Sequence, residues 1–254
     1  MSSLEDASNL EPELEELFLR WVPDMTSRWA SASGQDIAAI ERLAGGEIPR
    51  CYRWLLRRLG RGWAELGYGS LDFSARTIVD GHSRGLFPPC EGMMCIANDT
   101  AEWQPQLRYY DLAHPAKDDA PVFAGWPDEG GLSSEFQTLR ELIGAAVFKN
   151  HRLQMLPVRC EGVFVDEDKG DVLDVLIPLF EELGFQPPIP GGPLSLLYDN
   201  GMVAFSSYRR PHRLMVHLVP FVLGGPSMSA LRKVLGSVST STHLVIKRLS
   251  WNSP

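Results

Sequence analysis

The sequence is poor in cysteine, and its few cysteines are not arranged in pairs. Cys51, Cys90, Cys95 and Cys160 are the four that occur, and no two of them form a C-x-x-C motif. This spacing gives neither the disulfide framework of a small secreted domain nor a zinc knuckle. His82 precedes Cys90 and Cys95, but a fourth zinc ligand is not evident. We therefore expect buried free thiols and no metal site.

Long apolar runs are also missing, which excludes a membrane-spanning helix from the expected structure. No stretch approaches the roughly 18 consecutive apolar residues that such a helix needs. The chain starts with MSSLEDASNLEPELEEL, which is acidic and lacks the basic and apolar regions of a signal peptide. We expect a cytoplasmic protein that does not act on a membrane.

Glycine-rich phosphate loops do not occur, so no nucleotide cofactor is expected. One catalytic motif does occur, since Gly81–Gly85 matches G-x-S-x-G. In α/β-hydrolases this motif forms a sharp turn between a strand and a helix that exposes a nucleophilic serine, which would be Ser83 here. Asp199 and His243 follow in the order that a serine hydrolase needs. The prolines at 88–89 disfavour the required helix. We interpret this segment as a loop and keep a serine hydrolase as an alternative.

Positive charge is scarce in the first part of the chain. Residues 1–150 carry 14 Lys and Arg against 23 Asp and Glu, a net charge of −9, whereas residues 151–254 carry a net charge of +1. A nucleic-acid-binding protein needs a basic surface, so this class is not expected. An acidic surface suits a basic protein partner, although acidic surfaces also simply keep proteins soluble.

The most informative stretch is residues 33–62, SGQDIAAIERLAGGEIPRCYRWLLRRLGRG, which predicts two short helices joined by a tight turn. Ser33 is a candidate N-cap, with Asp36 three residues later. Two glycines at 45–46 end the first helix, and Pro49 suits the first position of the second helix. Gly60 is a natural stop for that helix.

This stretch resembles the opening of the SUKH superfamily, the Smi/Knr-like proteins, many of which are bacterial immunity proteins. The matching residues are Ile37, Ile40, Glu41, Leu43, Gly45, Ile48, Pro49, Tyr52, Leu56 and Gly60. Further segments resemble the strands and closing helix of that family: residues 96–99, 110–112, 121–126 and 136–142. The resemblance covers roughly residues 33–150. It implies an α+β fold in which helices pack a mixed sheet.

The pattern of periodicity and turn residues predicts the remaining elements. In residues 1–150 we expect a helix from Pro12, strands at 76–79, 93–97, 107–112 and 121–126, and a helix capped by Ser133 that runs to about Lys149. In residues 151–254 we expect the order β-α-β-β-β-α-β, with a hairpin at Asn200-Gly201 and a helix ended by Gly236. The chain thus reads as a SUKH-like domain over 1–150, followed by a smaller two-layer α+β module over 151–254.

The resemblance implies a non-enzymatic binding protein that neutralises a cognate toxin, for example a nuclease. The alternative from the same family is an intracellular scaffold or regulator. Aromatic and acidic residues of the first domain are the expected partner surface, since aromatics are enriched at binding hot spots. These residues are Trp63, Glu65, Tyr68, Asp72, Asp99, Glu102, Trp103, Trp126 and Asp128. No catalytic residue or cofactor is expected, and the expected partner is a basic protein domain.

Overall fold

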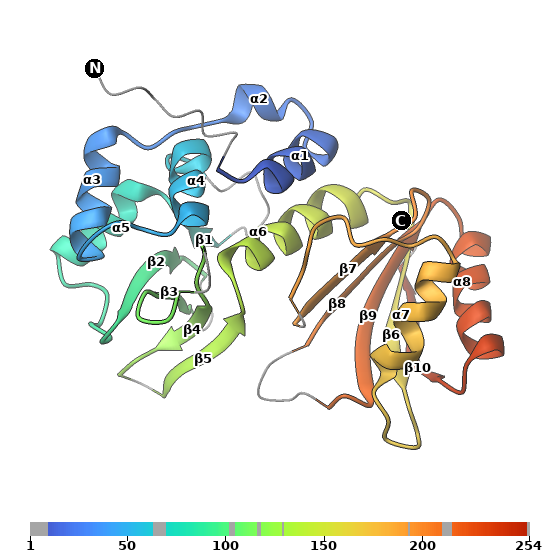
Figure 1. The fold of residues 1–254 in the computed structure, drawn as a ribbon. Coiled ribbons are helices and arrows are strands. Elements are labelled where there is room, and N and C mark those ends of the chain that lie inside the picture. Colours follow the sequence, from blue (N-terminus) through green and yellow to red (C-terminus); the bar gives the residue numbers. More distant parts are fainter. Residues whose placement is uncertain are drawn as a thin grey trace. The chain divides into compact units, whose positions relative to one another are not determined.

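A computed structural model describes residues 10–62, 70–101, 105–115, 118–128, 130–192, 194–209 and 215–252. The chain divides into two compact units, Met1–Val147 and Phe148–Pro254 (Figure 1). Each unit combines helices with one five-stranded antiparallel sheet, which confirms the expected α+β class.

The first unit begins with helices and continues into its sheet. Its elements are α1 (Pro12–Trp21), α2 (Met25–Arg28), α3 (Gly34–Leu43), α4 (Arg50–Leu59), β1 (Leu71–Asp72), α5 (Ala75–Ser83), β2 (Met93–Asp99), β3 (Leu107–Asp111), β4 (Val122–Trp126), β5 (Gly131–Phe136) and α6 (Leu139–Val147). The expected strand at 76–79 is wrong, because these residues lie within α5. The expected helix start at Ser133 is also wrong, since Ser133 pairs with Ala124 in the sheet.

The first sheet follows the chain in the order β1-β2-β3-β4-β5, and all pairings between its described strands are antiparallel. The expected mixed sheet is therefore wrong. In the described residues of the connections between these strands, the one helix is α5, between β1 and β2, whereas a parallel pairing needs a longer crossover, usually a helix.

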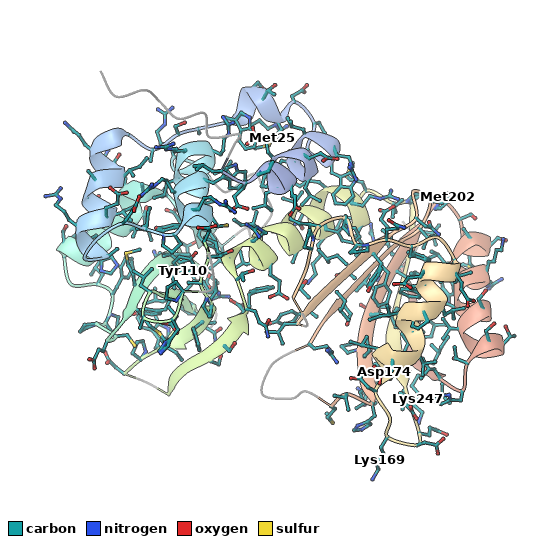
Figure 2. All side chains as sticks on the ribbon, in the orientation of Figure 1. Met25, Tyr110, Lys169, Asp174, Met202 and Lys247 are labelled. Carbon is teal, nitrogen blue, oxygen red and sulfur yellow. The ribbon has the colours of Figure 1, made fainter. Side chains whose placement is uncertain are left out.

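Helices cover both faces of this sheet. The register places Cys95 and Tyr109 on one face, where they pack with Ile78 of α5. Tyr110 points to the other face, and its ring lies 5.7 Å from that of Tyr52 in α4. Figure 2 labels Tyr110, which is completely buried within the first unit. The sheet is thus fixed between α5 and α4, which leaves its strand ends to form surface.

The two-helix stretch has the expected caps. The Ser33 side chain accepts the backbone N–H of Asp36 at 3.1 Å. At the other end of α3, Gly46 N–H donates to the Glu41 carbonyl and Gly45 N–H to the Arg42 carbonyl, which is a Schellman motif. Gly45 has φ of +75°, a conformation that favours glycine.

The second helix of the pair starts one residue later than expected, because Pro49 is the N-cap of α4 and Arg50 its first residue. A Cβ at Gly60 would lie 2.6 Å from the Cβ of Ala32, so only glycine fits this helix end. Ile40, Tyr52 and Leu56 are buried, whereas Leu43 is 42% exposed. Leu43 therefore does not belong to the buried face of α3.

The second unit is a sheet with two long helices on one face (Figure 1). Its elements are the π-helix η3 (Phe148–Leu153), β6 (Val158–Val165), α7 (Val172–Glu182), β7 (Ser195–Asp199), β8 (Ala204–Tyr208), β9 (Leu218–Gly225), α8 (Met228–Ser241) and β10 (Val245–Asn252). The order of strands and α-helices from β6 onward is the predicted one. The expected helix end at Gly236 is wrong, since α8 continues to Ser241.

The second sheet has the order β10-β6-β9-β8-β7. Phe164, Phe205 and Phe221 point toward the helices and form the core with Phe180 of α7. The Asn200-Gly201 turn joins β7 to β8, which confirms the predicted hairpin. The alternate residues of the strands line the opposite face of this sheet.

Candidate functional site

The register of the first sheet gathers several of the predicted partner-binding residues at one end of the sheet. Asp72 of β1 pairs with Asn98, next to Asp99 at the end of β2. Strand β3 starts beside the end of β2, and Leu107 pairs with Gly125 near the end of β4. We call Asp72, Asp99, Trp126 and Asp128 the carboxylate end. Two interstrand spacings put β2 and β4 about 10 Å apart.

Asp72 fixes the turn into helix α5 while remaining partly exposed. Its carboxylate accepts the backbone N–H of Ser74 at 2.8 Å and the hydroxyl of Thr77 at 2.7 Å. These two bonds fix the carboxylate at the edge of the sheet. The two bonds use different oxygens of the carboxylate, so an asparagine, with its single carbonyl oxygen, removes the charge and keeps one acceptor.

Asp99 organises the connection from β2 to β3. Its carboxylate accepts the backbone N–H groups of Ala101 at 3.0 Å and Gln106 at 3.1 Å. Partial burial raises the pKa of Asp99, but these hydrogen bonds and the nearby Arg108 outweigh that effect and lower it below its usual value. Asp99 is therefore held in its charged form.

Trp126 and Asp128 complete the carboxylate end. The indole N–H of Trp126 donates to the Pro105 carbonyl at 2.7 Å, and its half-buried ring packs against the small cluster around Tyr109. Asp128 is exposed in the turn after β4. Trp126 thus offers part of a rigid aromatic surface close in sequence to the exposed carboxylate of Asp128. Phe73, another aromatic residue of the first unit, is fully buried and cannot contribute to this surface.

The cation within this end of the sheet is already neutralised. Arg108 of β3 lies between β2 and β4, and its guanidinium donates to Glu135 of β5 at 3.1 Å. Among the parts of the chain that the structure describes, no cation forms an ion pair with Asp72, Asp99 or Asp128. The negative potential of this end is therefore not cancelled by an ion pair.

The other predicted partner-binding residues, Trp63, Glu65, Tyr68, Glu102 and Trp103, lie outside the described residues. In the sequence, Trp63, Glu65 and Tyr68 precede β1, and Glu102 and Trp103 follow β2.

The turn between α3 and α4 borders a cavity of about 580 Å³. Arg50 and Arg53 line it, together with Ile48, Pro49 and Asp118. Both guanidinium groups form ion pairs, Arg53 with Glu41 and Glu47, and Arg50 with Glu11 and Asp118. These pairs join α4 to its neighbours, so the cations serve the fold.

The hydrolase pattern does not have its required geometry. Ser83 is the last residue of helix α5, whereas a nucleophile elbow follows a strand. In the second unit, Asp199 forms an ion pair with Arg152, and His243 lies 3.0 Å from Asp166. Asp199 and His243 therefore each have a partner other than Ser83.

The cysteines are free thiols, and three of them are fully buried. Burial raises the pKa of Cys95 to about 12 and that of Cys160 to about 11. His82 contacts the Cys95 carbonyl at 3.2 Å through its ring nitrogen. Within the described ranges, no group of three or more His, Cys, Asp and Glu side chains could hold a metal ion.

No helix in the described segments combines the length and the apolar character needed to cross a membrane. Comparison with known proteins finds no matching family model, no matching curated protein and no matching solved structure.

Proposed function

We propose that this chain is a non-enzymatic, cytoplasmic protein-binding protein of the immunity type, and that the carboxylate end of its first sheet captures a basic toxin domain. The observation that carries this proposal is the gathering of Asp72, Asp99 and Asp128 beside Trp126, with Arg108 between them neutralised by Glu135.

The arrangement suits recognition of a cationic cleft. Carboxylates fixed by backbone hydrogen bonds lose little side-chain entropy when a partner binds, and Asp72 and Asp99 are fixed in this way. A half-buried tryptophan supplies apolar contact area next to them. A toxin that acts on nucleic acid carries a basic active-site cleft, which such a surface would occlude.

The negative charge of the first unit also favours fast association with a basic partner. The first unit has a large excess of acidic residues, and long-range attraction accelerates association with a basic partner. The resemblance of residues 33–150 to SUKH proteins supports the same class of function by analogy.

A pulldown from the native host tests the proposal. The tagged full chain is incubated with lysate at low and moderate salt, and the bound proteins are identified by mass spectrometry. The test variant is Asp72→Asn/Asp99→Asn/Asp128→Asn, which removes three charges and keeps one acceptor oxygen at each position. The control variant, Glu13→Gln/Asp24→Asn/Glu91→Gln, loses the same charge elsewhere in the first unit.

We expect one basic toxin-like protein to bind to the wild type and to the control variant, with a smaller amount bound at moderate salt than at low salt. The test variant should not capture this protein. Equal capture by both variants would overturn the assignment of this surface. Capture of many housekeeping or cell-envelope proteins would instead indicate a scaffold.

A further inference from the structure

A second site lies in the second unit, on the sheet face opposite α7 and α8. A cavity of about 370 Å³ opens there above β6 and β9. Its apolar floor is formed by Val163, Pro220 and Val222, which alternate along the strands with the core residues Phe164 and Phe221. This volume lies in the range of small-molecule sites, about 300–1,000 Å³.

A buried hydroxyl lines this cavity without a hydrogen-bond partner. Ser206 of β8 is 2% exposed, and none of the described groups bonds its Oγ. A buried polar group left unpaired costs about 1–3 kcal/mol. The hydroxyl can both donate and accept, so a polar ligand in the cavity would satisfy it.

The first cation at the cavity comes from the π-helix. Residues 148–153 form η3, which packs against β8 and β9. Lys149 lines the cavity, and its Nζ lies 5.5 Å from the ring centroid of Tyr208. Such π-helical turns are rare and occur frequently at functional sites.

The second cation comes from a β-bulge. The pairing of β10 with β6 shifts between Lys247 and Ser250, so that two residues oppose Gly162. If side chains alternated regularly along β10, residue 248 would point toward α7 and α8. Because of the bulge, Arg248 instead lines the cavity on the opposite face of the sheet. Arg248 has φ of +55°, which is strained for a residue with a side chain. The bulge thus delivers a guanidinium to the cavity.

The geometry points to a binding site for a small organic anion, with a carboxylate or phosphate group on an apolar body. Lys149 and Arg248 would neutralise the acidic group, Ser206 would hydrogen-bond to the ligand, and the apolar body would lie on Val163 and Val222. Glu161 also lines the cavity and accepts the Ser250 hydroxyl at 3.1 Å. Its negative charge opposes an anion and therefore limits affinity.

Two-dimensional NMR on the full chain tests this site with three probes: benzoate, phenyl phosphate and the neutral benzamide. We expect benzoate or phenyl phosphate to shift the amide resonances around residues 161–163, 206–208 and 220–222. Which of the two binds more tightly identifies the acidic group. Benzamide should bind about tenfold more weakly, since hydrogen bonds to charged groups are the stronger ones.

Matched variants give the sign of each contribution. Lys149→Gln and Arg248→Gln should each weaken anion binding about tenfold, and the control Lys233→Gln, an exposed cation on α8, should not. Glu161→Gln should strengthen anion binding.

Ser206→Ala should weaken binding without lowering the thermal unfolding temperature, because it removes an unpaired hydroxyl. Equal binding of benzamide and the anions, shifts elsewhere, or no binding of any probe would overturn the proposal.

Discussion

The carboxylate of Asp119 accepts the backbone N–H of Leu139 at 3.0 Å, so helix α6 is capped by a residue twenty positions earlier in the chain. The same carboxylate accepts the Arg140 N–H at 2.9 Å and the Tyr110 hydroxyl at 2.6 Å. Asp119 is almost fully buried and thereby joins the sheet to the start of α6.

Removing this cap should destabilise the first unit strongly. Asp119→Ala leaves a buried tyrosine hydroxyl and two helix N–H groups without their acceptor, and we expect a loss of about 3 kcal/mol in the free energy of unfolding. The control Asp118→Ala removes a neighbouring exposed carboxylate, for which a loss of about 0.5 kcal/mol is expected. Urea denaturation followed by tryptophan fluorescence measures both. Equal losses would contradict the capping role of Asp119.

The four thiols should react at very different rates. Cys90 is partly exposed, whereas Cys51, Cys95 and Cys160 are buried, and burial raises their pKa values. Because the thiolate is the reactive form, iodoacetamide at about pH 8 should modify Cys90 at least tenfold faster than the others. Mass spectrometry of peptides measures the rates, and the urea-unfolded chain is the control. Rapid modification of Cys51 in the folded chain would show that the first core is open.

Acid should weaken the second unit through Asp166. The hydrogen bond with His243, together with the Asp168 N–H, lowers the pKa of Asp166 from its ordinary value of 3.8. The folded state therefore favours the ionised carboxylate, which stabilises the fold above pH 3.8, and this contribution is lost as the pH falls below that value.

Asp166→Asn removes this titration. The free energy of unfolding of the variant should fall less steeply than that of the wild type between about pH 5 and pH 3. Asp168→Asn, an exposed neighbour, serves as the control and should retain the wild-type slope. Chemical denaturation at several pH values supplies the comparison, and parallel curves for Asp166→Asn and wild type would rule out this contribution.

Local patterns were sufficient for much of the fold. The caps of α3, the turn at Gly45 and the hairpin at Asn200-Gly201 all depend on residues within a few positions of one another, and the sequence predicts them. The error at residue 133 has a long-range cause. Residues 131–136 carry a serine that suggests a cap, yet pairing with β4 makes them a strand. Helix α6 starts at Leu139 instead, where Thr138 accepts the Glu141 N–H locally and the distant Asp119 accepts the Leu139 N–H.

The sites were less predictable than the elements. Asp72, Asp99, Trp126 and Asp128 are each predictable as single residues, but their gathering depends on the strand register. Lys149 and Arg248 were not predicted, and they reach the second cavity through a π-helix and a β-bulge. Neither irregularity has a simple periodic signature. Ser206 becomes notable only because it is buried and unpaired among the residues that the structure describes.

The association rate of the captured partner tests the central claim most directly. Stopped-flow fluorescence gives the rate constant at several ionic strengths for the wild type, Asp72→Asn/Asp99→Asn/Asp128→Asn and the control Glu13→Gln/Asp24→Asn/Glu91→Gln. If the carboxylate end steers the partner, the test variant should associate at least about fivefold more slowly at low salt, with a shallower salt dependence than the control. Identical rates and salt dependences for the two variants would contradict capture through this surface.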